Sequence, residues 1–344
     1  MKELFSVNFN GFFRNLFFSI LGTALVFCLF FLTYSLVFNL ITSKPEKVKD
    51  IFERSSLYSD LPAVLYDQTL EKTAEKSGSD IPLRDPEIRQ IALDVYSPQF
   101  VRSNTEKLVD GIYGWLEGHT DSPEISLDFT EKNKEFAAEA GKYAEKRAKG
   151  LPVCSPAQIQ NAEKFNALSS ECLPSQVSPA QVRKEISEGD NALLDSKLTA
   201  GDIKTNDGKP LHESFSNLPK SFSLLKKIPI ILFILAFILA GIAVYFSESL
   251  VSGLKRVSRT FLIAGILTAS APILLAYLVK RILSGASISS EASDITRTLF
   301  VEFMSNASKI YYFSGVLFIL IAGGLYVYAK KLEKDTDKIP KMKS

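Results

Sequence analysis

Four long apolar stretches interrupt an otherwise polar chain. They cover residues 16–41, 228–247, 260–279 and 310–329, and none of them contains Asp, Glu, Lys, Arg or His. A helix needs about 20 residues to cross the hydrocarbon core of a bilayer, whereas a buried helix of a soluble protein normally keeps a polar face. The pattern therefore predicts a mainly α-helical membrane protein with four transmembrane helices, one before and three after a long polar segment.

The first apolar stretch shares features with a cleaved signal peptide and with a retained anchor. Residues 1–15 precede it and carry Lys2 and Arg14, as the basic start of a signal peptide would. Its 26 residues exceed the roughly 7–15 of a signal peptide's apolar core, and the sequence TSKP at 42–45 offers no small-residue cleavage site. We therefore expect a signal anchor that stays in the membrane.

The distribution of Lys and Arg predicts the orientation, because cytoplasmic flanks of transmembrane helices carry the excess of these residues. Residues 1–15, the connection between the second and third stretches, and the tail 330–344 together hold eleven, against four in the loop before the last stretch. The main determinants follow the second and fourth stretches: Lys255, Arg256, Arg259, Lys330 and Lys331. We expect a multi-pass protein of the plasma or inner membrane with both termini cytoplasmic and residues 43–227 extracytoplasmic.

Residues 43–227 are numerous enough to bury a core of their own, and their pattern is mainly helical. Helices are predicted to begin at four prolines that follow a capping Ser or Asp: Pro86, Pro98, Pro156 and Pro179. In the second of them Val101, Leu108 and Trp115 recur at helical spacing. Alternation over 125–129 predicts a short strand, with a partner expected within 192–204, so the domain has a minor β component.

The loop 281–309, expected on the same side as this domain, contains a further helical pattern. Ile295, Leu299 and Phe303 recur at helical spacing. An amphipathic helix there would rest on the membrane or on the large domain. Its polar face is not notably basic, which favours docking on the domain.

Two of the three cysteines, Cys154 and Cys172, lie in the domain that we place outside the cytoplasm. That compartment favours a disulfide, and closing a loop of this size stabilises a fold by about 3 kcal/mol. The alternative is a redox pair, which normally has C-x-x-C spacing that this pair lacks. Cys28 lies inside the first apolar stretch, where it is interpreted as a small apolar residue.

Small residues and one proline shape the predicted helix bundle. Pro272 is in the middle of the third stretch, where its missing N–H predicts a kink. Gly265, Gly323 and Gly324 belong to small faces that allow close helix packing. These faces suit packing within the chain and also a seam between copies in a homo-oligomer.

Charge and motifs exclude several classes of function. A net charge of +2 from 40 basic and 38 acidic residues excludes a nucleic-acid-binding protein held by bulk positive charge. Three Cys and two His make no zinc framework, and the sequence has no Walker A, G-x-S-x-G or G-x-G-x-x-G motif. Uncharged spans argue against an ion-coupled transporter. We therefore assign no catalytic, cofactor-binding or metal-binding residue and do not expect an enzyme.

Two sequence blocks point to a family. One is YSPQFVRSNTEKLVDGIYGWLEG at 96–118, and the other pairs LPVC at 151–154 with ECLP at 171–174. These blocks resemble uncharacterised bacterial membrane proteins with one N-terminal anchor helix, a helical extracytoplasmic domain and three C-terminal transmembrane helices. The resemblance covers most of the chain and implies this architecture and the pairing of Cys154 with Cys172. It implies no activity.

Two functional hypotheses follow. The first is a non-enzymatic envelope protein whose extracytoplasmic domain binds a partner protein, a lipid or a cell-wall component. Such a protein would contact the lipid bilayer and either a protein partner or a second copy of itself. The alternative is a permease-like subunit of an ATPase-driven complex, because FtsX- and MacB-like subunits share the layout of one helix, an outside domain and further helices. That analogy rests on topology alone.

Overall fold

The computed structural model describes residues 2–75, 84–155, 168, 170–189, 196–205, 207–283 and 290–337. It is mainly α-helical, and four of its helices are long and apolar enough to cross a membrane. The chain divides into two compact units. The membrane unit comprises residues 1–51, 220–288 and 300–344, and the polar unit comprises residues 52–219 and 289–299.

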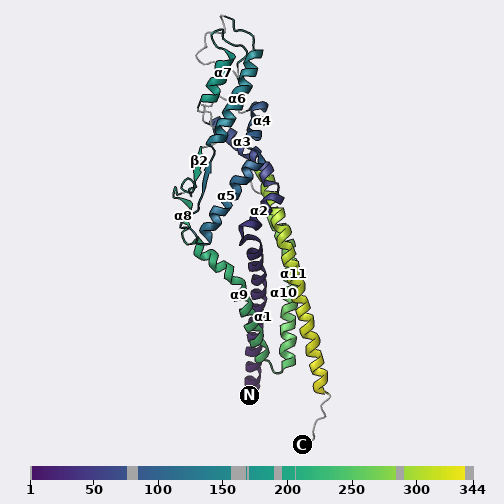
Figure 1. Cartoon of the computed structure of the whole chain (residues 1–344). Coiled ribbons are helices and arrows are strands. Elements are labelled where there is room, and N and C mark those ends of the chain that lie inside the picture. The colour runs from purple at the N-terminus through teal and green to yellow at the C-terminus, as the bar shows by residue number, and fades with distance from the viewer. Residues whose placement is uncertain are drawn as a thin grey trace. The chain divides into compact units, whose positions relative to one another are not determined.

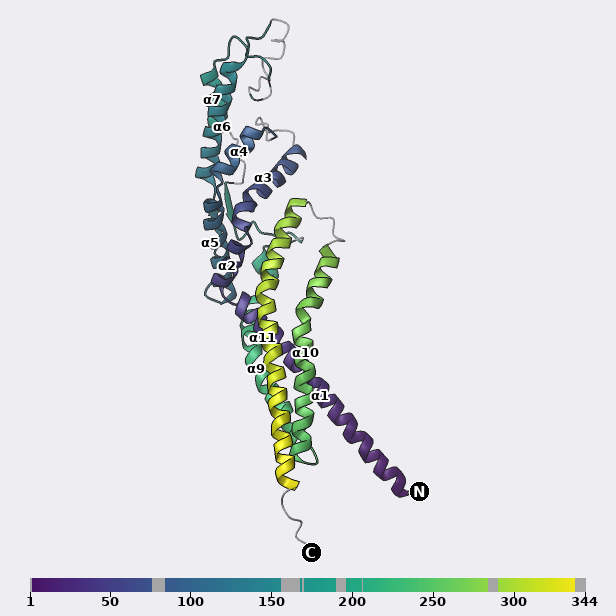
Figure 2. The same ribbon diagram turned by 90° about the vertical axis from the view of Figure 1, so that its right-hand side faces the viewer.

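The membrane unit consists mainly of four long helices, which Figures 1 and 2 show from two sides. They are α1 (Lys2–Thr42), α9 (Leu218–Tyr245), α10 (Leu250–Leu283) and α11 (Ser290–Asp337), the last contributing its residues from Phe300 onward. Each corresponds to one of the four predicted apolar stretches, although α9 ends at Tyr245, two residues before the second stretch ends. The other ends of the helices extend beyond the stretches, because backbone hydrogen bonding continues into their flanks.

The predicted loop 281–309 and the last predicted span do not form separate elements where the structure describes them. Instead α11 runs without a break from Ser290 to Asp337. No Pro or Gly occurs between Ser290 and Gly315, so nothing in the sequence stops the helix where the apolar stretch begins. The periodic residues Ile295 and Phe303 therefore belong to α11.

α10 and α11 approach each other closely at two glycines. A Cβ atom on Gly265 would lie 2.9 Å from the carbonyl oxygen of Gly315, and one on Gly315 would lie 2.9 Å from the Cβ of Ala269. The Ser258 hydroxyl donates a hydrogen bond of 2.8 Å to the carbonyl of Ala322 across the same pair of helices. Small residues thus bring the two backbones together, as in many membrane helix pairs.

The other predicted packing residues have different surroundings. Pro272 is buried within α10. A Cβ added to Gly323 or Gly324 would meet nothing within 4 Å, and both glycines are exposed on α11. Their small face is therefore not used for packing within the described part of the chain.

α1 packs through one face on the other helices of the membrane unit. Leu25, Cys28 and Leu29 are buried in a cluster with Ala264 of α10 and Phe318 of α11. The Cys28 thiol donates to the carbonyl of Leu232 in α9 at 3.2 Å, and Cys28 has no disulfide partner. This agrees with its interpretation as a small residue within a helix interface.

Short helices and two strands build the polar unit. The helices are α2 (Pro45–Arg54, shared with the membrane unit), α3 (Leu57–Glu75), α4 (Pro86–Val95), α5 (Pro98–Leu116), α6 (Thr130–Gly150), α7 (Pro179–Glu188) and α8 (Leu211–Ser214). The predicted starts at Pro86, Pro98 and Pro179 are confirmed, each with the side chain of the preceding residue accepting from a free backbone N–H. The predicted start at Pro156 lies outside the described residues.

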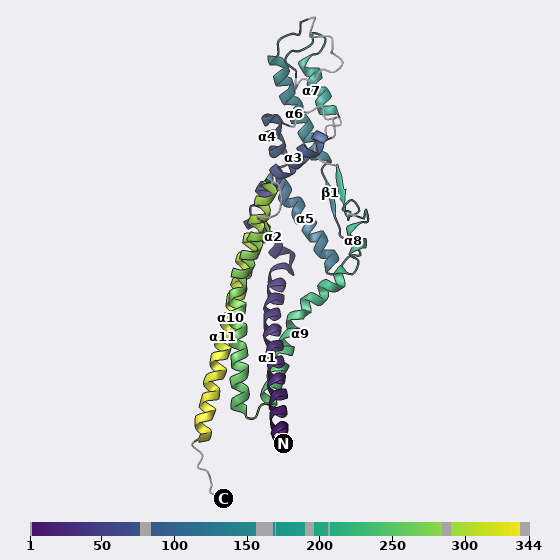
Figure 3. The same cartoon turned by 180° about the vertical axis from the view of Figure 1, so that it is seen from behind.

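The two strands, β1 (Ser126–Asp128) and β2 (Lys197–Thr199), lie within the predicted ranges and form an antiparallel pair (Figures 1 and 3). Leu127 is opposite Leu198, and Asp128 is opposite Lys197 with 3.8 Å between carboxylate and ammonium. The two leucines project from the same face of the pair.

The core of the polar unit centres on α6, whose alanine-rich face receives α4 and α7. Phe136, Ala140 and Ala144 are almost fully buried against Ile88 of α4 and Val182 of α7. α7 lies close because α6 has a glycine at 141, where a Cβ would lie 2.9 Å from the carbonyl oxygen of Arg183.

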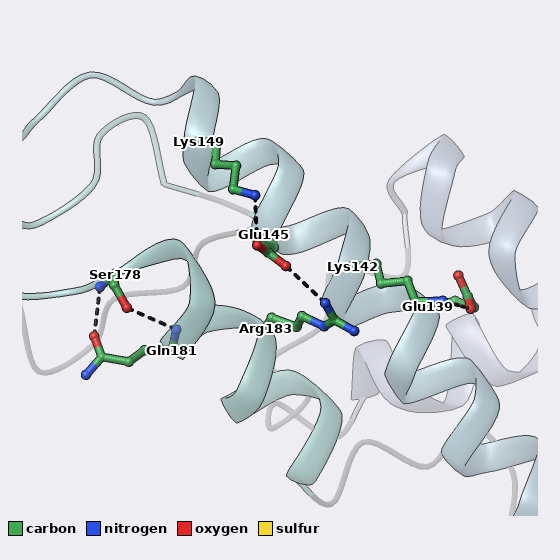
Figure 4. A network of polar contacts seen from close by, with 7 residues as sticks. All are labelled: Glu139, Lys142, Glu145, Lys149, Ser178, Gln181 and Arg183. Carbon is green, nitrogen blue, oxygen red and sulfur yellow. Dashed lines mark hydrogen bonds and ion pairs between the residues drawn. The ribbon is translucent and has the colours of Figure 1, made fainter.

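Polar contacts and a disulfide fix the α6–α7 pair. Glu145 of α6 lies 2.8 Å from the Lys149 ammonium and 3.4 Å from the Arg183 guanidinium of α7 (Figure 4). The same figure shows the reciprocal hydrogen bonds between Ser178 and Gln181 that cap α7. A disulfide joins Cys154 to Cys172, and Cys154 N–H donates to the carbonyl of Leu173 at 3.0 Å.

Candidate functional site

A cavity of about 420 Å³ lies inside the polar unit. Three helical segments and the strand pair form its wall. The lining residues are Leu61, Pro62, Leu65 and Tyr66 of α3; Ala92 of α4 and Tyr96 just after it; Phe100, Val101, Asn104, Thr105 and Leu108 of α5; and Leu127, Phe129 and Leu198 around the strands.

Local sequence places these side chains on the cavity. The α5 lining residues recur at spacings of three and four, so they share one face of the helix. Ser97 fixes where α5 begins, since its side chain accepts from the backbone N–H of Phe100. Leu127 and Leu198 face each other across the strand pair, so the same pleat face supplies the opposite wall.

Two tyrosines in the wall stay neutral. Burial raises the pKa of Tyr66 to about 12, even though the Arg89 guanidinium, 6.0 Å from the ring centroid, opposes this shift. Burial raises the pKa of Tyr96 further, and its hydroxyl contacts the amide oxygen of Asn133. Neither phenol ionises near neutral pH, so neither supplies charge or a nucleophile to the cavity.

The remaining lining is almost entirely apolar. Among the described residues it contains no Asp, Glu, Lys, Arg, His, Ser or Cys. Its polar side chains besides the tyrosines are Asn104 and Thr105, and the Asn104 amide donates to the Phe100 carbonyl of its own helix at 2.9 Å. Such a lining binds an apolar group by removing it from water.

The structure gives no sign of a metal centre where it is described. No group of three or more His, Cys, Asp or Glu in the described residues is placed to hold a metal ion. His119 is exposed in the turn after α5, with its Nδ1 3.8 Å from the Glu117 carboxylate.

The disulfide and helix-packing residues predicted from sequence do not line the cavity. Cys154 and Cys172 join the segments after α6 and before α7, while Pro272, Gly265, Gly323 and Gly324 belong to α10 and α11. None of these six lines the cavity.

The predicted topology determinants are all in the membrane unit. Lys255 forms an ion pair of 2.9 Å with Glu333, and the Arg256 guanidinium stacks on the Phe18 ring. Arg259, Lys330 and Lys331 are exposed.

The cavity itself was not predicted, although part of its wall was visible in the sequence. Val101 and Leu108 recur at helical spacing, which indicates an inward face without showing whether that face is packed or open. No residue of the wall carries a recognisable binding motif, so the signal exists only in the folded arrangement.

Comparison with protein-family models, with curated proteins and with solved structures finds no match for this chain. The resemblance to uncharacterised bacterial membrane proteins therefore stays a prediction. The class of protein follows from the chain's own structure: a mainly α-helical, multi-pass integral membrane protein in contact with the lipid bilayer.

Proposed function

We propose that this protein is a non-enzymatic membrane protein whose polar unit binds the acyl chain of a lipid. One observation carries the proposal, the cavity of about 420 Å³ whose described lining lacks any charged side chain. Its volume is in the usual range for small-molecule sites, which is about 300–1,000 Å³.

The chemistry of the wall favours a lipid over the two other ligand classes predicted from sequence. A cell-wall glycan presents hydroxyl and amide groups, and burying those without hydrogen-bond partners is unfavourable. A methylene chain needs no such partners. Each buried methylene contributes about 0.8 kcal/mol, so about ten contribute about 8 kcal/mol before the cost of association.

A protein partner is less well supported than a lipid. The cavity is a partly open, almost wholly apolar recess of about 420 Å³, whereas a protein interface normally presents a broader surface with a polar rim. The four membrane-spanning helices also tether the cavity to a source of lipid, which raises the effective concentration of that ligand.

The proposal includes the predicted orientation, with the polar unit outside the cytoplasm. The excess of Lys and Arg in the short flanks supports it, and so does the Cys154–Cys172 disulfide, since such bonds persist in oxidising compartments. Single-cysteine variants test the orientation in intact cells with a membrane-impermeant maleimide. Lys107→Cys in the polar unit should react and Lys331→Cys should not, and the reverse pattern would contradict the proposed orientation.

Photo-crosslinking tests the ligand. The full-length protein in phosphatidylcholine nanodiscs is irradiated with palmitic acid that carries a diazirine on its chain, and the modified peptides are mapped by mass spectrometry. We expect crosslinks in α3 and α5 in addition to those on the four spans. The span crosslinks are an internal reference, because they report only contact with the bilayer.

Cavity-filling variants test whether the α3 and α5 crosslinks come from lipid inside the cavity. Leu108→Trp places an indole in the cavity and should abolish the α3 and α5 crosslinks, while Leu116→Trp, on the same helix but outside the lining, should leave them unchanged. Leu198→Trp fills the cavity from the strand side and serves if Leu108→Trp fails to fold. Absence of α3 and α5 crosslinks in the unmodified protein, or their persistence in both filled variants, would refute acyl-chain binding.

A further inference from the structure

A second cavity, of about 300 Å³, lies within the membrane unit and is independent of the proposed lipid-binding function of the polar unit. It is bounded by the first turns of the α1 span, the last turns of α9 and the first turns of α10. Its polar lining comprises Asn15 and Ser19 of α1 and Arg256, Arg259 and Thr260 of α10. No carboxylate of the described residues lines it.

Arg256 has an unusual environment for a cation. Its guanidinium carbon lies 3.8 Å from the centroid of the Phe18 ring, a close cation–π stack. Its Nη1 atom is shielded from water and has no hydrogen-bond partner among the residues that the structure describes. A buried, unpaired donor on a charged group is unfavourable, so this arrangement favours an anion that compensates the charge.

Two neighbouring cations, in contrast, have carboxylate partners. Arg14 forms an ion pair with Glu248, and Lys255 forms one of 2.9 Å with Glu333. Arg256 has no such ion pair with a described carboxylate, although it is next to Lys255 in the sequence.

The position of the cavity along the helices indicates where the anion comes from. Arg14 and Glu248 flank the apolar parts of α1 and α9, and Arg256 and Arg259 precede the apolar part of α10. These residues therefore lie where the helices pass from the hydrocarbon region to the polar interface, which is the depth of lipid headgroups.

From these observations we propose that the cavity binds the phosphate of an anionic phospholipid, with Arg256 and Arg259 as its charged ligands. The two arginines are three residues apart and share a helix face. A guanidinium matches a phosphate with two parallel N–H donors, which an ammonium does not reproduce. The Asn15 amide supplies a further hydrogen-bond donor in the same lining, whereas the Thr260 hydroxyl donates to the Arg256 carbonyl at 3.2 Å.

The same arginines were predicted as topology determinants, and that role alone makes a different prediction. The positive-inside rule depends on charge and not on the shape of the charged group. If Arg256 only sets the orientation, Arg256→Lys is neutral in every assay. If it binds phosphate, Arg256→Lys keeps the orientation but weakens lipid retention.

Native mass spectrometry of the full-length protein provides the test. The protein is released from nanodiscs of phosphatidylcholine with or without phosphatidylglycerol, and retained lipids are counted. We expect one phosphatidylglycerol to be retained preferentially, an approximately tenfold loss of its retention in Arg256→Gln, and a smaller loss in Arg256→Lys. Lys331→Gln removes the same charge from an exposed site on α11 and should change retention little.

Thermal unfolding in detergent checks that each variant is folded. Arg259 is exposed, so Arg259→Gln is expected to fold even if Arg256→Gln does not, and it should also weaken retention. The proposal would be overturned if phosphatidylcholine were retained as well as phosphatidylglycerol. It would also be overturned if Arg256→Gln and Lys331→Gln lost phosphatidylglycerol equally, or if folded Arg256→Gln retained it unchanged. Displacement of the lipid by inorganic phosphate would overturn the choice of a lipid as ligand.

Discussion

The two units of this protein differ in where their large apolar side chains lie. In the polar unit the large side chains are inside, as shown by Phe136, which is only 1% exposed. In the membrane unit Ala264, at 0% exposure, is buried beside larger residues such as Leu25, and large side chains are also found outside, where Phe313 is 72% exposed. Water drives the first arrangement through the hydrophobic effect. Lipid tails are as apolar as the side chains, so the second arrangement depends on close backbone packing.

Changes in side-chain size should therefore have opposite consequences in the two units. Removing a large side chain should destabilise the polar unit, and adding one at the helix crossing should destabilise the membrane unit. Four sets of substitutions test this contrast, in decreasing order of magnitude.

Phe136→Ala should cause the greatest loss of stability. It removes a buried aromatic ring at the centre of the α6 core and should lower the free energy of unfolding of the polar unit by about 3–5 kcal/mol. Hydrogen exchange of the α6 amides in nanodiscs measures this change. The matched control, Phe313→Ala, removes a ring that faces outward from the membrane unit and should have an effect near zero. Comparable losses in both variants would contradict the contrast.

Loss of the disulfide should cause the second-largest loss of stability. Cys154→Ser with Cys172→Ser releases a closed loop and should lower the stability of the polar unit by about 3 kcal/mol. The membrane unit should be unaffected, because its cysteine, Cys28, has no disulfide partner. Alkylation checks the oxidation state first: in the native protein Cys154 and Cys172 should react with iodoacetamide only after reduction.

Gly265→Leu should destabilise the membrane unit by about 2 kcal/mol, because the new side chain overlaps the Gly315 backbone and Ile319. Unfolding in increasing mole fractions of dodecyl sulfate measures the change. Gly323→Leu is the control, since nothing lies within 4 Å of a Cβ at that position. If Gly323→Leu instead changed the oligomeric state measured by size exclusion, its helix face would be the interface between copies, which is the second of the two packing roles considered from the sequence.

Ser178→Ala should have the smallest effect, lowering the stability of the polar unit by about 1 kcal/mol, because it removes one half of the reciprocal cap of α7. The loss should appear in hydrogen exchange of the first α7 amides. Ser175→Ala, at an exposed position before the helix, is the control and should leave those amides unchanged.

Much of the fold was predictable because its signals are local. The starts of α4, α5 and α7 depend on one capping side chain and one proline each, so four or five residues suffice to locate them. The spans were equally clear, because an uncharged apolar run of about 20 residues is long enough to cross a bilayer and lacks the polar face of a soluble helix.

Other features depend on contacts between distant residues and were not predictable. Hydropathy changes near residue 310 but helicity does not, so α11 is longer than the apolar pattern within it. Gly265 and Gly323 look alike in sequence, yet only Gly265 meets a neighbouring backbone. The acyl-chain cavity is a space between helix faces that the sequence shows only as apolar. Whether the Nη1 of Arg256 has a partner depends on which carboxylates form ion pairs with the neighbouring cations.

The packing of α1 has a consequence for biosynthesis. The residues that bury its inner face lie on α9, α10 and α11, and the first of these helices begins about 175 residues after α1 ends. At about 5–20 residues per second, the ribosome needs about 10–35 s to synthesise that interval, so α1 is in the bilayer for this time without its partner helices. Its buried hydroxyls need no partner helix, because Thr33 donates to the carbonyl of Leu29 and Ser35 to that of Leu32 within α1. The first helix thus inserts with these hydroxyls already satisfied.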